Sequence, residues 1–163
     1  MDVTATFQLT PREFRQAIRN LPTIRRIALL SVLFTVAGLV ELFTSNHPQW
    51  WLIVTGPGLL VFLELAAVRG ATRRSAPLLA NPWTVRVTEG SYRLETNASS
   101  AKVGWSNYRE VTERAGFWYL HQANRAVSFL PQQAFNETDR AQVAAFFAAK
   151  LPAQPRPWYR ALI

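Results

Sequence analysis

The chain has 163 residues and a formal net charge of +8 at pH 7, a length that allows one modest domain beside a pair of membrane helices. It contains no cysteine, which excludes disulfides, thiol nucleophiles and cysteine-based zinc sites. The whole positive excess lies in residues 12–26 and 69–86, which each carry +4. The rest of the chain is balanced, so no basic face of the kind a nucleic-acid partner requires is expected.

The N-terminal segment, residues 1–22, predicts a strand followed by an amphipathic helix. Residues 3–9 alternate between apolar and polar side chains, as a half-buried strand does. Thr10 and Glu13 have the spacing of a capping box, and Pro11 between them suits a first helical position. The helix has an apolar stripe formed by Phe14, Ile18 and Leu21. Two alternatives stay open for this stripe: the helix lies in the lipid headgroups, or it packs on the rest of the domain.

Residues 23–69 predict a transmembrane hairpin. Two apolar runs, residues 27–43 and 50–68, are separated by only six polar residues. Each run is close to the roughly 20 residues that cross a 30 Å hydrocarbon core. A six-residue gap holds no domain, so the two helices return antiparallel. We expect Gly38 and Gly56, at similar depths, to allow close packing of the two helices.

Basic residues on both flanks predict the orientation of the hairpin. The loop between the runs has no Lys or Arg, whereas the other ends are rich in arginine. The positive-inside pattern therefore places both termini in the cytoplasm of a multi-pass protein. We expect contact with lipid headgroups from eight arginines: Arg12, Arg15, Arg19, Arg25, Arg26, Arg69, Arg73 and Arg74.

Two carboxylates fall within the apolar runs, Glu41 near the outer end and Glu64 near the inner end. An intramembrane acid can mark an ion or proton pathway. These two lie too far apart for a shared site, which favours a simpler interpretation: Glu41 reaches outward, and Glu64 pairs with Arg25, Arg26 or Arg69.

After a basic linker at residues 70–82, residues 83–151 predict an antiparallel sheet domain closed by a helix. Short alternating segments lie at 84–88, 92–96, 102–105, 108–114, 117–121 and 126–130. From Asn136 the spacing becomes helical. The sheet is expected to curve into a small, partly open barrel plugged by this helix, with four aromatic core residues: Trp105, Phe117, Phe129 and Phe135.

Three segments of this domain resemble the YcxB-like family of bacterial membrane proteins: Trp105-Ser106-Asn107-Tyr108, Phe117-Trp118-Tyr119-Leu120 and Val127-Ser128-Phe129-Leu130-Pro131. In the family a basic residue commonly follows the proline, where this chain has Gln132 and Gln133. The resemblance implies an α+β membrane protein of the bacterial inner membrane, with a pleckstrin-homology-like sheet domain. It supplies architecture more than activity.

No catalytic triad, phosphate-binding glycine loop or metal-ligand cluster is visible, so neither an enzyme nor a cofactor is expected. The favoured hypothesis is a membrane-anchored cytoplasmic binding or scaffold module with an unknown protein partner. The alternative is a membrane-resident immunity factor, or an accessory subunit of a channel or transporter. The Pro-rich tail, residues 152–163, offers Trp158 and Tyr159 as candidate partner contacts, and a homo-oligomer is left open.

Overall fold

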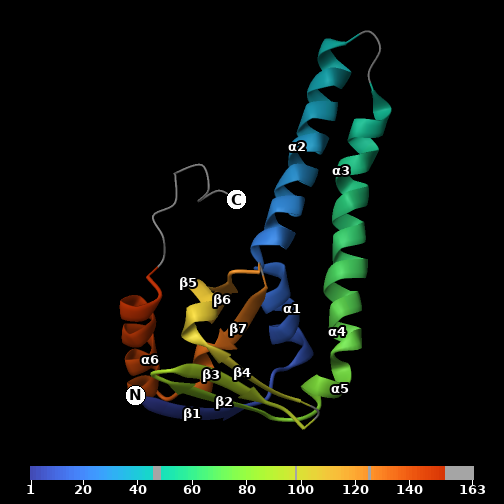
Figure 1. Cartoon of the computed structure of the whole chain (residues 1–163). Helices are drawn as coiled ribbons and strands as arrows, with labels where there is room; N and C mark the ends of the chain where they lie inside the picture. Colours follow the sequence, from blue (N-terminus) through green and yellow to red (C-terminus); the bar gives the residue numbers. More distant parts are fainter. Residues whose placement is uncertain (46–48, 98, 125, 153–163) are drawn as a thin grey trace. The chain divides into compact units, whose positions relative to one another are not determined.

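The computed structural model describes residues 1–45, 49–97, 99–124 and 126–152, and it is α+β (Figure 1). The chain divides into two compact units. The first, the sheet unit, comprises residues 1–17 and the chain from Ser75 onward through the last helix. The second, the hairpin unit, comprises residues 18–74.

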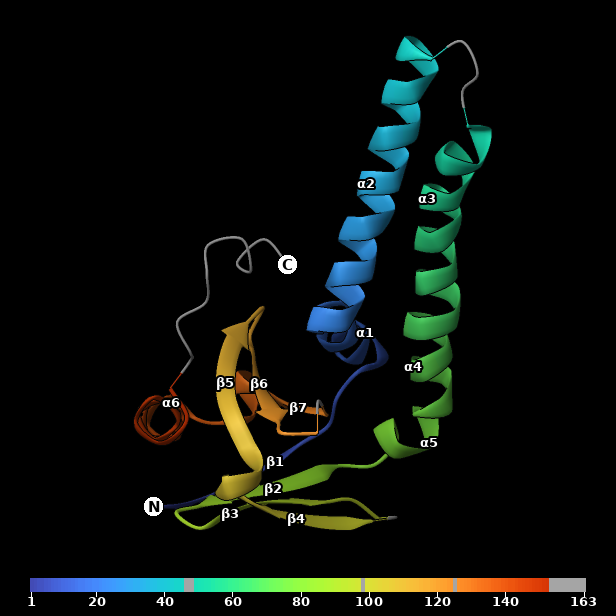
Figure 2. The same ribbon diagram turned by 45° about the horizontal axis from the view of Figure 1, so that its top comes forward.

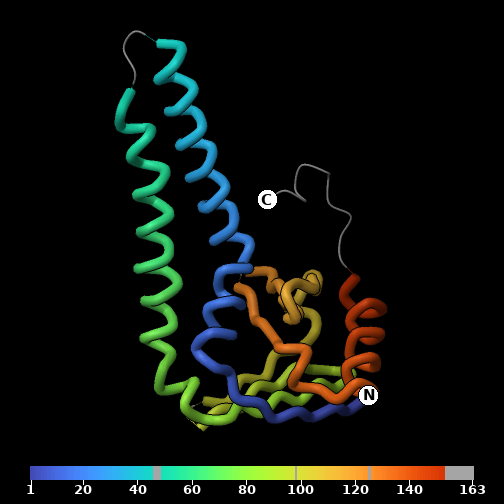
Figure 3. The backbone as a smooth tube through the Cα atoms, turned by 180° about the vertical axis from the view of Figure 1, so that it is seen from behind, coloured from blue at the N-terminus to red at the C-terminus, as the bar shows by residue number. Residues whose placement is uncertain are grey.

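A four-stranded antiparallel sheet in the order β1-β2-β3-β4 forms one layer of the sheet unit. Its strands are β1 (Asp2–Phe7), β2 (Trp83–Thr88), β3 (Ser91–Glu95) and β4 (Ser100–Gly104). The N-terminal strand pairs with β2 across more than 75 residues of sequence, with Val3 opposite Val87 and Ala5 opposite Val85. Residues 1–17 therefore fold with the later sheet segments (Figure 3).

A three-stranded antiparallel sheet in the order β5-β6-β7 forms the second layer (Figure 2). It contains β5 (Tyr108–Arg114), β6 (Phe117–Gln122) and β7 (Val127–Pro131), and the helix α6 (Glu137–Lys150) follows it. Short 3-10 turns precede β5 (η2, Trp105–Asn107) and follow β7 (η3, Gln132–Ala134). The expected antiparallel sheet domain is confirmed, but its described strands form two separate sheets in place of one curved sheet, and they form no closed barrel.

The tight turn between β5 and β6 is made by Ala115 and Gly116, both with positive φ, 49° and 79°. Two consecutive left-handed residues match the twist of the strands that they join. The amide of Gln132 also donates to the Gly116 carbonyl at 2.9 Å, so this turn is tied to the end of β7.

The core of the sheet unit lies between the two sheets and α6. Leu120 and Leu130 are fully buried, and aromatic rings fill the space beside them. The ring of Phe147 on α6 lies 5.7 Å from Trp105 and 5.4 Å from Trp118, both edge-on. Of the four expected core aromatics, three are buried, and Phe129 is half-buried.

The helix α1 (Pro11–Arg19) begins with the expected capping box. The Glu13 amide donates to Thr10 Oγ1 at 3.2 Å, and the Thr10 amide donates to Glu13 Oε2 at 2.8 Å. Phe14 packs edge-on against Phe129 at 5.6 Å, and the Tyr119 hydroxyl donates to the Ala17 carbonyl at 3.1 Å. Of the two alternatives left open for the apolar stripe, these contacts favour packing on the domain.

The hairpin unit contains two long helical segments (Figure 1). The first is α2 (Pro22–Thr44). The second consists of α3 (Trp50–Phe62), a π-helical segment η1 (Leu63–Arg69) and α4 (Gly70–Arg74) in succession. The short helix α5 (Ala76–Leu79) begins the return to β2. By length and composition alone, the two long segments could cross a membrane.

Candidate functional site

The contact between α2 and α3 is built around two glycines. A Cβ added to Gly56 would lie 2.0 Å from Thr35 Oγ1 and 2.6 Å from the Ser31 carbonyl oxygen. A Cβ on Gly38 would lie 2.8 Å from the Ile53 side chain. Each glycine is buried and lies against residues of the opposite helix, and neither lies against the other glycine.

Polar side chains of α2 turn inward at this contact or onto their own helix. Ser31 is fully buried, and its hydroxyl donates to the Ile27 carbonyl at 2.8 Å. Thr35 donates to the Ser31 carbonyl at 2.9 Å. Each hydroxyl therefore has a partner without water, as an apolar solvent would require.

Glu64 lies in the π-helical segment and forms an ion-pair cluster with two arginines of the hairpin unit. Its carboxylate receives two bonds from Arg19, at 2.6 Å from Nη2 and 3.1 Å from Nε, and lies 3.7 Å from Arg69 Nε. The expected pairing with Arg69 is confirmed, and Arg19 is a partner that the sequence did not indicate. Glu41 accepts from the Gln49 amide at 3.3 Å, where α3 begins.

The eight arginines expected at lipid headgroups occupy four places in the chain. Arg12, Arg15 and Arg19 lie on α1, Arg25 and Arg26 in the first turns of α2, Arg69 at the end of η1, and Arg73 and Arg74 on α4. Most are exposed. Arg15 donates to the Pro11 carbonyl at 3.1 Å. Trp158 and Tyr159 lie outside the described residues.

A row of cations crosses the outer face of the four-stranded sheet. Arg86 on β2 lies directly opposite Arg93 on β3, and Arg93 lies directly opposite Lys102 on β4. All three side chains are exposed, because the intervening positions Val85, Val87 and Tyr92 face the core. We call these three residues the cationic row.

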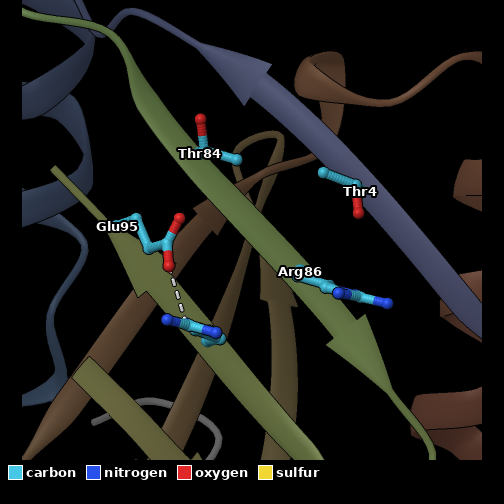
Figure 4. Close-up of a pocket in the computed structure, with 5 residues that line it drawn as sticks. Thr4, Thr84, Arg86 and Glu95 are labelled. Carbon is cyan, nitrogen blue, oxygen red and sulfur yellow. Dashed lines mark ion pairs between the residues drawn. The ribbon is translucent and has the colours of Figure 1, made fainter. Parts of the chain in front are cut away.

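Acidic residues beside the row hold its two arginines in place. Arg86 Nε donates to Asp2 Oδ1 at 2.8 Å, and a second bond joins Arg86 Nη2 to Asp2 Oδ2. This hydrogen-bonded guanidinium lowers the pKa of the Asp2 carboxyl below its ordinary value. Arg93 Nε lies 2.7 Å from Glu95 Oε1 on the same strand (Figure 4).

A shallow depression of about 190 Å³ lies along this row, lined by Thr4, Thr84, Arg86, Arg93 and Glu95 (Figure 4). The hydroxyl of Thr84 also lies 3.2 Å from that of Thr6. Within the described ranges, no group of His, Asp and Glu side chains is arranged to hold a metal ion. The depression therefore offers guanidinium and hydroxyl donors but no set of metal ligands.

Sequence reasoning missed the cationic row, because Arg86, Arg93 and Lys102 are far enough apart that only strand register aligns them. The signal was present in a weak form: each residue is a base at an outward position of a predicted alternating strand. Aligning the strands around their turns would have placed the three side by side.

The similarity to a known family lies in the end of β2, the strands β3 to β7 and most of α6. Residues 87–147 match the family model described as YcxB-like protein. This segment is similar to that family. The match confirms the resemblance over the sheet domain and does not extend to the hairpin. No curated protein and no solved structure matches the chain.

Proposed function

We propose that the protein is a membrane-anchored binding module, in which the hairpin unit spans a membrane and the sheet unit carries the binding surface. One observation carries the anchor: the helices of the hairpin direct their large apolar side chains away from the protein. In the most apolar 18-residue stretch of each segment, only 11% and 17% of the residues are buried. The core helix of a soluble protein would be mostly buried.

The individual side chains support this interpretation. Leu33 on α2 is 54% exposed, and Phe62 on α3 is 64% exposed. Among the described residues, all but one of the exposed large apolar side chains lie in the hairpin unit; the exception is Leu78. An apolar surface of this kind belongs in an interface or a lipid phase.

The inner contact of the hairpin supports the same proposal. In lipid no hydrophobic force drives two helices together, so close backbone approach at small residues must hold them. Gly38 and Gly56 provide that approach, and Ser31 and Thr35 satisfy their own hydroxyls. The arginines lie at the start of α2 and at the end of the second segment, away from the residues that connect the two helices. By the positive-inside rule, this placement favours cytoplasmic termini and an inner-membrane location.

The sheet unit supports a binding role more than a catalytic one. We propose that its two antiparallel sheets and α6 form the pleckstrin-homology-like architecture that the resemblance implies. Its outer face carries charged and hydroxyl groups over a shallow depression, which suits recognition by ion pairs and hydrogen bonds. We therefore propose that partners bind the sheet unit and that the hairpin has no catalytic part.

Alkaline carbonate extraction of cell membranes tests the anchor. The wild-type chain should stay in the membrane pellet. The double variant Leu33→Arg/Leu60→Arg should leave it, because each arginine at the centre of a span costs about 2.5–3.5 kcal/mol of insertion free energy. The control Gln142→Arg, at an exposed position of α6, should stay in the pellet. Release of the wild-type chain by carbonate would overturn the proposal.

A further inference from the structure

The cationic row has a charge arrangement that the fold does not require. Directly opposite side chains on neighbouring antiparallel strands have Cβ atoms about 4.5–5.5 Å apart, and like charges in such pairs destabilise the sheet. Arg86, Arg93 and Lys102 form two such like-charged pairs in succession. With strands about 4.8 Å apart, the backbone positions of the three cationic residues lie within roughly 10 Å of one another.

The acids beside the row do not neutralise it. Asp2 pairs with Arg86 and Glu95 pairs with Arg93. Lys102 forms no ion pair with any residue that the structure describes. The five charged groups therefore leave an excess of one positive charge, concentrated on the face that carries the depression.

The geometry of the depression matches a small anion. Glu95 lies near Arg93 Nε, at 2.7 Å, which fixes the guanidinium in the sheet surface. Asp2 fixes Arg86 in the same way. Thr4 and Thr84 line the same depression and add hydroxyl donors. Guanidinium groups with neighbouring hydroxyls are the donors that proteins use for phosphate oxygens.

The chemistry of the face distinguishes a soluble anion from a lipid surface. Peripheral membrane binding combines basic residues with apolar side chains that enter the acyl region. No exposed large apolar side chain occurs on the described strands of this sheet. A soluble ligand therefore fits better than a phospholipid headgroup.

We propose that the depression on the outer face of the sheet binds a small soluble phosphomonoester or inorganic phosphate dianion. Arg86 and Arg93 are the main ligands, Thr4 and Thr84 donate from their hydroxyls, and Lys102 adds charge from the next strand. The site deepens the proposed function, because it names a ligand class for the binding module and rests on that role for the sheet unit.

The test is a titration of the full-length protein in a maltoside detergent with inorganic phosphate, followed by ³¹P NMR at constant ionic strength. The wild-type protein should show saturable binding. Arg93→Gln should weaken it at least tenfold, and Thr84→Val, which keeps the side-chain shape, should weaken it several-fold. Glu95→Gln should tighten it, because one negative charge leaves the depression. The matched control Arg109→Gln, exposed on β5 of the other sheet, should bind as the wild type does.

Equal weakening by Arg93→Gln and Arg109→Gln would show only general electrostatic attraction and would overturn the site. So would absence of saturation in the wild-type protein. Dimethyl phosphate, a monoanionic diester that stands in for a lipid headgroup, should bind at least several-fold more weakly than phosphate. Equal affinity would overturn the assignment to a soluble dianion.

The same samples separate this inference from the proposed anchor. Every variant should remain in the carbonate-resistant membrane fraction and keep the wild-type circular dichroism spectrum. A wild-type chain that stays in the membrane but does not bind phosphate would refute the anion site alone. A chain that binds phosphate but leaves the membrane on carbonate treatment would refute the anchor alone.

Discussion

The sheet unit and the hairpin unit of this chain are organised in opposite ways. In the sheet unit, Leu120 and Val85 are fully buried while Arg86 and Lys102 face outward. In the hairpin unit, Leu33 and Phe62 face outward while the hydroxyl-bearing Ser31 is fully buried. The sheet unit is stabilised by removing apolar surface from water. The outward apolar surface of the hairpin is instead of the kind found in an interface or a lipid phase, which supports the proposed anchor.

The difference extends to what holds each unit together. Large aromatic rings fill the core of the sheet unit, with Trp105, Trp118 and Phe147 in edge-on contact. The hairpin instead depends on the absence of side chains at Gly38 and Gly56. Substitutions that remove atoms should therefore damage the first unit, and substitutions that add atoms should damage the second.

The largest effect is expected from Leu120→Ala in the sheet unit. Leu120 is fully buried on β6, and truncating a buried leucine costs about 2–5 kcal/mol of unfolding free energy. Leu33→Ala, the same substitution at an outward position of the hairpin, should change the stability of the sheet unit by less than about 0.5 kcal/mol. Urea unfolding followed by tryptophan fluorescence measures both. Equal losses would contradict the comparison.

The next largest effect is expected from Gly56→Ala in the hairpin. The added Cβ would meet Thr35 Oγ1 and the backbone of Ser31, which cannot move aside without separating the helices. Overpacking of this kind costs about 1–3 kcal/mol. Gly58→Ala is the matched control, because nothing lies within 4 Å of a Cβ there.

Spin labels measure this effect directly, since the chain has no cysteine of its own. Labels at Val40→Cys and Val54→Cys, both exposed, should report a larger α2–α3 separation in Gly56→Ala than in Gly58→Ala. If both variants kept the wild-type distance between the two spin labels, the glycine contact would not hold the helices together as described.

A smaller, pH-dependent effect is expected at the start of α1. The hydrogen bond from the Thr10 amide lowers the pKa of Glu13 below its ordinary value, with further help from the Thr10 hydroxyl and Gln133. Glu13 therefore contributes stability that is present above its unfolded pKa and is lost as the pH falls through its folded pKa.

Glu13→Gln should lower the stability of the sheet unit at neutral pH by about 1 kcal/mol, the usual worth of a helix cap. It should also flatten the loss of stability below about pH 4.5. Glu113→Gln, exposed on β5, is the control for loss of a surface carboxylate and should change the unfolding free energy at neutral pH by less than about 0.5 kcal/mol. Thermal unfolding between pH 7 and pH 3 provides the measurement.

The smallest effect is expected from Glu64→Gln. Arg19 and Arg69 are about half exposed, and exposed ion pairs contribute about 0–1 kcal/mol. The variant should remain in the membrane, with hydrogen exchange around Arg19 raised only several-fold. This substitution also distinguishes the two function classes: loss of a cellular activity at normal expression would favour a channel or transporter component, in which Glu64 acts itself.

Local patterns in the sequence predicted most elements of the fold. Turn residues and alternating side chains placed the segment 108–114 where β5 lies, and they placed the other strands within two residues of their observed ends. Asn136 caps α6 as its position indicated, accepting from the Asp139 amide at 2.8 Å. These features depend on neighbours in sequence, so the sequence alone carries them.

Features that depend on distant partners were predicted less well. The division into two sheets depends on β1 pairing with β2 and on the break at Trp105–Asn107, and neither is a local signal. The bond from Arg19 to Glu64 joins residues 45 apart, and the π-helical form of Leu63–Arg69 was not predicted. The cationic row required the register of three strands.

The most direct test of the account is the accessibility of single cysteines in intact cells to a membrane-impermeant thiol reagent. Ser45→Cys reports the loop end of α2, and Arg109→Cys reports the exposed face of β5. An anchor with both termini in the cytoplasm predicts that Ser45→Cys reacts in intact cells and that Arg109→Cys reacts only after permeabilisation. Reaction of both sites, or of neither, in intact cells would contradict a hairpin that spans the membrane and holds the sheet unit inside.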